Sequence, residues 1–175
     1  GTTTINGTVA SRYRGISLSV GSTTASSVQG NTIAGWSVQS SSGATTPPGV
    51  FTGIYLTSGS ANIGTVTGNT IGSGTGTGSI TASTSTTGGI SYGIAVDASG
   101  TVSNISNNII GSINTVGTTT LSHSFAGIAA TSGTTLTINN NSIGSSATSN
   151  SINASPAATG STATVLTGVL NSSSA

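Results

Sequence analysis

The chain has 175 residues, a formal net charge of +1 and 2% charged residues, against roughly 25% in an ordinary globular domain. This charge leaves no electrostatic footprint for nucleic acid or anionic lipid, and the lack of cysteine excludes a disulfide framework and a thiolate metal site. No run of about 18 apolar residues occurs, so the sequence predicts no membrane-spanning helix.

The first distinctive segment along the chain is SRYRG, which carries both arginines, Arg12 and Arg14. We expect it to be a solvated loop or an interface to neighbouring structure, and contact with a partner or a glycan is the alternative. Tyr55 joins this set of candidate surface contacts. It alternates with two aliphatic neighbours in GIYL, which predicts that its side chain points outward.

Pairs of glycine and isoleucine recur from the start of the chain onward, at Gly15, Gly53, Gly93 and Gly127. The segments GISL, GIYL and GIAV that they open alternate with period two, which indicates strands. No segment shows a sustained helical period. Abundant Ser, Thr, Gly and Asn disfavour helix interiors, whereas β-branched Thr, Ile and Val favour strands.

A second motif follows each glycine–isoleucine pair, as VQGNTI, VTGNTI, ISNNII and INNNSI. Its asparagines lie 38, 39 and 33 residues apart, a period typical of stacked repeats. Asparagine tolerates left-handed backbone, so we expect each one at a corner between strands. It is either an ordinary turn residue or part of a ladder of amides bonded from coil to coil. The four are Asn31, Asn69, Asn108 and Asn141.

The number of residues from the glycine of each glycine–isoleucine pair to the next motif asparagine is nearly constant. The number from that asparagine to the next such glycine varies. Such variation maps to one side of a stacked repeat, where a loop can protrude without breaking the stack. The variable parts are tracts rich in Gly, Ser and Thr at 72–89, 111–122 and 144–164. We therefore expect variable loops on one side.

These spacings predict an all-β fold, a parallel β-helix of about four to five coils of 33–39 residues, stacked about 4.8 Å apart. Residues 1–175 would form one segment, which we interpret as part of a longer array. Equivalent aliphatic residues would form interior rows. The expected rows are Ile33, Ile71, Ile110 and Ile143; Val28, Val66, Ile105 and Ile138; and Ile16, Ile54, Ile94 and Ile128.

The pattern G-I-x-L, followed about a dozen residues later by V-x-x-N-x-I, resembles the right-handed parallel β-helix repeats of the pectate-lyase-like superfamily. Segments such as TVSNISNNIIG look like the very large Ser/Thr/Gly-rich surface proteins of Bacteroidetes. That resemblance covers about residues 15–170. It implies a right-handed helix, export by the type IX secretion system, and a role like that of adhesins, including gliding-motility adhesins.

Residues that could perform chemistry are few. A glycosidase needs two carboxylates and a calcium site several oxygen ligands, but Asp97 is the only acidic side chain. We expect Asp97 in a turn and His123 as a surface or loop-packing residue. A catalytic Ser/His/Asp arrangement would require these two to meet. The sequence therefore predicts no catalytic residue, no cofactor and no metal site.

The sequence thus favours a non-catalytic, structural segment of a long extracellular or cell-surface adhesin, stalk or filament. Its expected partners are further coils of the same protein or neighbouring subunits stacked end to end, because open β-helix ends expose unpaired strand edges. A carbohydrate-binding surface module is the alternative. Glycans or surfaces could then be partners, whereas nucleic acid and a membrane span are not expected.

Overall fold

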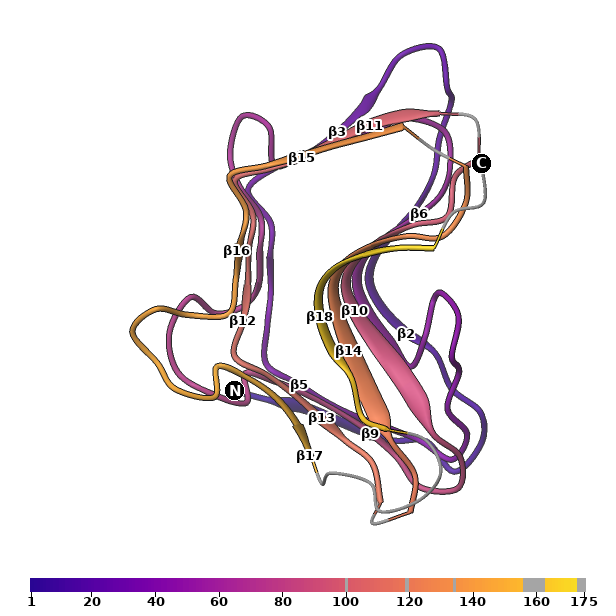
Figure 1. Ribbon diagram of the computed structural model, residues 1–175, viewed down its shortest axis with the longest axis vertical. Coiled ribbons are helices and arrows are strands. Elements are labelled where there is room, and N and C mark those ends of the chain that lie inside the picture. The colour runs from indigo at the N-terminus through magenta and orange to yellow at the C-terminus, as the bar shows by residue number, and fades with distance from the viewer. Residues whose placement is uncertain (100, 119, 134, 156–162, 173–175) are drawn as a thin grey trace.

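A computed structural model describes residues 1–99, 101–118, 120–133, 135–155 and 163–172. These residues form strands and connecting loops, with no helix among them. The described part therefore holds no helix that could cross a membrane. Figure 1 looks along a stack of coils, in which strands of the same sheet lie behind one another.

Four parallel sheets make up the walls of the stack, named here A to D. Sheet A consists of β1 (Thr3–Asn6), β5 (Trp36–Ser40), β9 (Ile80–Thr84), β13 (Ile113–Val116) and β17 (Ile152–Ser155). Sheet B consists of β2 (Tyr13–Ser19), β6 (Phe51–Ser58), β10 (Gly89–Val96), β14 (His123–Ala130) and β18 (Leu166–Asn171). Sheet C consists of β3 (Ser26–Val28), β7 (Ala61–Ile63), β11 (Val102–Ser106) and β15 (Thr135–Asn139). Sheet D consists of β4 (Thr32–Ile33), β8 (Thr70–Gly72), β12 (Ile109–Gly111) and β16 (Ser142–Ile143).

The chain passes through sheets B, C, D and A in that order and then begins the next coil. Every strand pairs in parallel with the equivalent strand of the neighbouring coil, as β10 does with both β6 and β14. The predicted all-β, parallel solenoid is thereby confirmed. Because each strand has a partner one coil away, most backbone hydrogen bonds join residues distant in sequence.

The register of the pairs places equivalent aliphatic side chains in rows along the stack. Ile33, Ile71, Ile110 and Ile143 are aligned in sheet D. Ile16, Ile54, Ile94 and Ile128 are aligned in sheet B, and Val169 extends their row. Most members of both rows belong to one continuous apolar core.

The third expected row needs a correction at Val66. In sheet C the partner of both Val28 and Ile105 is Ile63, and Val66 is 86% exposed. The row is therefore Val28, Ile63, Ile105 and Ile138. The motif VTGNTI predicts the wrong member of this row because a loop at 64–68 separates the buried Ile63 from Asn69 in this coil.

The variable tracts contain strands that the sequence did not reveal. Each holds one strand of sheet A, namely β9, β13 or β17, between longer connections. Segments such as ITAST and INAS mix small and polar residues, so they resemble the surrounding loops in composition. Most of the variable connections flank sheet A, and the loop at 64–68 is an addition at the corner between sheets C and D.

Candidate functional site

A ladder of asparagine side chains runs along the corner between sheets C and D. The backbone N–H and side-chain Nδ2 of Asn31 both donate to Oδ1 of Asn69, at 3.0 and 2.9 Å. Asn69 donates to Asn108 with the same two distances, and Asn108 donates to Asn141 in the same way. The four asparagines therefore form one directional chain of hydrogen bonds.

Backbone carbonyls at the corner complete this ladder. Asn69 Nδ2 also donates to Val28 O at 2.9 Å, and Asn141 Nδ2 donates to Ile105 O at 2.8 Å. Asn69 and Asn108 are essentially inaccessible to solvent. Since a buried polar group is costly unless it is hydrogen-bonded, the ladder both satisfies the corner backbone and fixes one coil against the next.

Charged and phenolic side chains gather on the outer face of sheet B. Asp97 follows β10 and accepts hydrogen bonds from Tyr55 Oη at 3.1 Å, Thr131 Oγ1 at 2.9 Å and Ser132 Oγ at 2.6 Å. The guanidinium of Arg14 lies 5.6 Å from the centre of the Tyr55 ring. Two of the expected surface contacts, Arg14 and Tyr55, are thus neighbours, and Asp97 links them to the next coils.

Tyr55 is not an exposed residue, contrary to the expectation from its outward alternation. Its exposed fraction is 7%, because a second apolar cluster covers the outer face of sheet B. That cluster comprises Tyr55, Tyr92, Ala95, Ala126 and Ala129, with Ile90 and Leu170 packed against it. Burial, assisted by Asp97, raises the pKa of Tyr55. The ring is therefore unavailable for stacking on a sugar.

The connection between β5 and β6 contributes to this cover. Ala44 O and Val50 N–H both bond to the backbone of Ile90, at 2.8 Å. A Cβ atom at Gly49 would stand 2.9 Å from the ring of Tyr92, so this connection passes directly over the tyrosine. Burial, together with Asp97 and Tyr55, raises the pKa of Tyr92 to about 12.

Arg12 binds the β5–β6 connection and does not lie on a free surface. Its Nη1 donates to Ser42 O at 2.9 Å and its Nη2 donates to Gly43 O at 3.1 Å. The side chain is half-buried. Arg12 therefore holds the start of the β5–β6 connection, while Arg14 lies on the exposed side of β2.

His123 is buried, with 1% of its surface exposed, so it does not lie on the surface. Its Nε2 lies 2.9 Å from Ser91 Oγ and its Nδ1 lies 3.3 Å from Val116 O. These partners suit a neutral ring that donates from Nδ1 and accepts at Nε2. Burial lowers the pKa of His123 to about 4, although the bond to Val116 opposes the shift. Asp97 is not among its hydrogen-bond partners.

A hollow lies between the connection from β5 and the end of β10. Its volume is about 590 Å³, and Thr45, Tyr92, Asp97 and Thr131 are among its lining residues. Asp97 is the only carboxylate side chain of the protein, and three hydroxyl donors already bind it. The arrangement can accept and donate hydrogen bonds, but it lacks the second carboxylate of a glycosidase pair.

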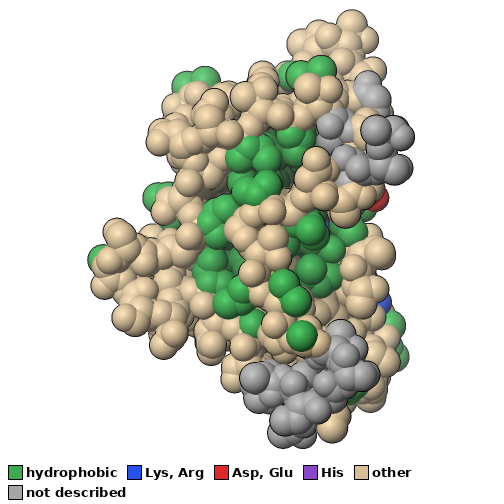
Figure 2. Space-filling model, viewed as in Figure 1, with side chains coloured by type: hydrophobic (Ala, Val, Ile, Leu, Met, Phe, Trp, Pro, Cys, Tyr) green, Lys and Arg blue, Asp and Glu red, His purple; other side chains and the backbone are tan. Residues whose placement is uncertain are grey.

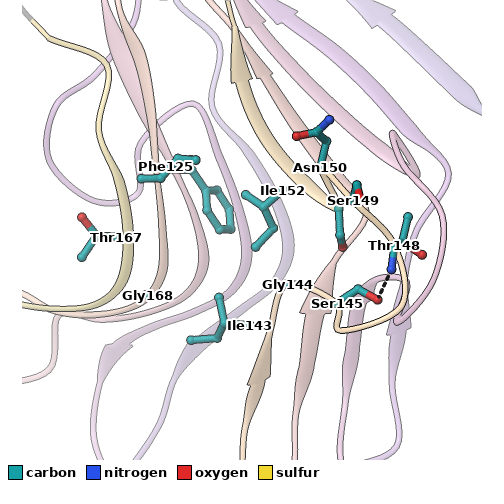
Figure 3. Close-up of a pocket in the computed structure, with 12 residues that line it drawn as sticks. Phe125, Ile143, Gly144, Ser145, Thr148, Ser149, Asn150, Ile152, Thr167 and Gly168 are labelled. Carbon is teal, nitrogen blue, oxygen red and sulfur yellow. Dashed lines mark hydrogen bonds between the residues drawn. The ribbon is translucent and has the colours of Figure 1, made fainter.

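The end of the stack formed by β15, β16, β17 and β18 exposes the apolar core. Figure 2 shows this end, with apolar side chains gathered over its centre. Phe125, Ile143 and Ile152 converge on a hollow of about 410 Å³ that Leu166 and Gly168 also line (Figure 3). Phe125 belongs to the apolar core of the stack, and Ile143 and Ile152 pack against that core.

Comparisons of the chain with protein-family models, with curated proteins and with solved structures find no match.

Proposed function

We propose that this chain is a non-catalytic, structural segment of a long extracellular adhesin, stalk or filament. The single observation that carries the proposal is the stacking of four coils through continuous backbone ladders and one continuous amide ladder. These bonds run along the stack, which is the direction in which a stalk must resist load. Outward-facing hydroxyl groups and near-zero charge keep the surface insensitive to salt.

The edges of the sheets support an assembly role. Among the described residues, β15, β16, β17 and β18 each pair with a strand on one side, and β1, β2, β3 and β4 do the same at the opposite end. Unpaired strand edges attract further strands unless they are covered. The proposed partners are accordingly further coils or neighbouring subunits stacked end to end.

The proposed origin and export route rest on the resemblance of the sequence alone. The likeness to Ser/Thr/Gly-rich surface proteins of Bacteroidetes suggests export by the type IX secretion system and a place on the cell surface. Immunogold labelling of intact source cells tests this. Label on extended surface structures supports the proposal, whereas label that appears only after the cells are broken open contradicts it.

Carbohydrate binding is the second candidate function. The observation that favours it is the 590 Å³ hollow beside Asp97, whose threonine and carboxylate groups could bond to sugar hydroxyls. The burial of Tyr55 and Tyr92 weighs against it, because neither ring can stack on a sugar face. A glycan array compared between the natural chain and Asp97→Asn tests this. A glycan bound only by the natural chain would support it.

A further inference from the structure

A hollow of about 390 Å³ lies on the outer face of sheet C and is bounded by three consecutive coils. The second coil joins β6 to β7 through residues 59–60, whereas the first coil joins β2 to β3 through residues 20–25. The longer connection projects beyond sheet C in Figure 1, and the shorter one leaves room beside it. Among the residues that line the hollow are Ser22, Thr23, Ser60, Asn62, Val102 and Asn104.

Ser60 fixes the position of the walls. Its backbone N–H donates to Gly21 O at 3.0 Å and its Oγ donates to Ser22 O at 3.2 Å, so it holds the β2–β3 connection of the first coil. The same Oγ accepts the backbone N–H of Val102, in the third coil, at 3.4 Å. Ser60 is itself only 5% exposed. Because these bonds are made within the protein, a ligand would meet a preformed site.

Two asparagine side chains from neighbouring coils lie side by side in the hollow. Asn62 of β7 and Asn104 of β11 are partners in the register of sheet C. Both point outward, because the residue that follows each of them is a buried isoleucine of the core. Asn104 Nδ2 donates to Asn62 Oδ1 at 2.7 Å. The other two amide atoms, Asn62 Nδ2 and Asn104 Oδ1, have no hydrogen-bond partner among the described residues. The pair thus offers a donor and an acceptor next to each other.

The rest of the lining is uncharged, with one exposed aliphatic side chain. Val102 is 56% exposed and lies on the same face of β11 as Asn104. Ser22 and Thr23 come from the opposite wall, and no lining residue is ionisable. A bound ion would lose hydration without gaining an opposite charge. A sugar ring instead combines adjacent hydroxyl groups, which both donate and accept, with C–H groups that pack on an aliphatic side chain.

We propose that this hollow binds a neutral saccharide. Asn62 donates to one hydroxyl group of the sugar, Asn104 accepts from the adjacent hydroxyl group, and Val102 packs on the C–H groups of the ring. The volume of about 390 Å³ lies within the range of pockets that hold small molecules. The site goes beyond the proposed structural function and does not depend on it, because three coils of this one chain form it.

The hollow on sheet C is separate from the hollow beside Asp97. The two share no lining residue, and they differ in charge, because Asp97 gives the other hollow a carboxylate. Attraction between charges weakens as salt is added. Binding of a neutral sugar on sheet C should therefore be insensitive to salt.

Nuclear magnetic resonance of the full 175-residue chain tests the proposal. The probes are the neutral disaccharides maltose, cellobiose, lactose and mannobiose, with glucuronic acid as the charged comparison. At least one disaccharide should saturably shift the side-chain amide signals of Asn62 and Asn104 and the methyl signals of Val102. Its affinity should agree within about twofold between low and high salt, and glucuronic acid should bind more weakly.

Variants assign the binding to the amide pair. Asn62→Ala combined with Asn104→Ala should weaken binding at least about tenfold. The melting temperature should change little, because the two side chains bond to each other on an outer face. Asn153→Ala removes an exposed amide from β17 and is the matched control. Val102→Ser, at an exposed position, tests the contact with the ring without removing an amide, and it should also weaken binding.

Three results would overturn the proposal. The first is the absence of saturable shifts with every neutral disaccharide, and the second is binding that the double variant and Val102→Ser leave intact. The third is a set of shifts confined to Tyr92 and Thr131, which would place the sugar beside Asp97 and support the second candidate function instead. None of them bears on whether the native protein is a surface fibre, so failure here and failure of the proposed structural function are distinguishable.

Discussion

Gly93 lies against Ile110 across the interior of the third coil. A Cβ atom at Gly93 would stand 2.7 Å from Ile110 Cγ2 and 2.5 Å from Gly127 O, which is closer than atoms can approach without displacement. The same relation joins Gly53 to Ile71 and Gly127 to Ile143. The glycine that opens each recurring glycine–isoleucine pair is therefore explained by the close approach of sheets B and D, because no side chain fits at its position.

Gly93→Ala should destabilise the protein by at least ~2 kcal/mol, since overfilling a packed interior forces neighbours to move. Gly168→Ala is the matched control, because its Cβ atom would meet nothing within 4 Å, and its effect should stay within about 0.5 kcal/mol. Urea unfolding of both variants measures the difference. Equal midpoints would show that the glycine row is not closely packed.

Asn69→Ala should cost about 1–3 kcal/mol, because it leaves the N–H of Asn31 without its acceptor and removes one of the two hydrogen bonds to the carbonyl of Val28. Asn153→Ala changes an exposed asparagine of β17 and should be nearly silent. Chemical denaturation again provides the measurement. A loss for Asn69→Ala no larger than that for the control would mean that the amide ladder does not stabilise the stack.

Ile71→Asp should unfold the coil or lower the melting temperature strongly, because it buries an unpaired charge in the core row. Thr75→Asp lies on an exposed loop between β8 and β9 and should change the melting temperature little. Circular dichroism melts distinguish the two variants. Indistinguishable melting temperatures would refute the placement of Ile71 in the interior.

The stability of the protein should decrease as the pH falls from about 6.5 to about 4. The unfolded chain protonates His123 near its ordinary pKa of about 6.5, whereas burial holds the pKa in the folded chain at about 4. Between these values the unfolded state binds more protons, so acid favours it. The full loss is about 3 kcal/mol, at 1.4 kcal/mol per pKa unit.

Because His123 is the only histidine of the chain, this pH dependence can be assigned to one residue. Unfolding free energies measured at pH 7.5, 6, 5 and 4.5 should fall steadily for the natural chain. His123→Gln should abolish most of the slope. If the variant keeps the same slope, another group is responsible.

The parallel solenoid could be predicted from sequence because its interior rows repeat at nearly fixed spacing. Ile33, Ile71, Ile110 and Ile143 each follow an asparagine by two residues, and the register aligns them. The sequence predicts the wrong residue at Val66 because the motif VTGNTI begins inside the inserted loop at 64–68. Local sequence does not show which of Ile63 and Val66 pairs with Ile105.

Other features depend on contacts between distant segments. The burial of Tyr55 comes from neighbouring coils that cover the outer face of sheet B, and alternation along GIYL carries no information about that cover. The burial of His123 likewise depends on Ser91 and Val116, which lie on other strands. The strands of sheet A could not be predicted from the sequence, because they have the composition of the adjoining loops.

Cryo-electron microscopy of the native protein isolated from its source tests the central claim most directly. The account predicts long, unbranched fibres one solenoid wide, with the axial spacing of about 4.8 Å that stacked parallel strands produce. Discrete compact particles without an axial repeat would contradict the proposal that this chain is a structural segment of a stalk or filament.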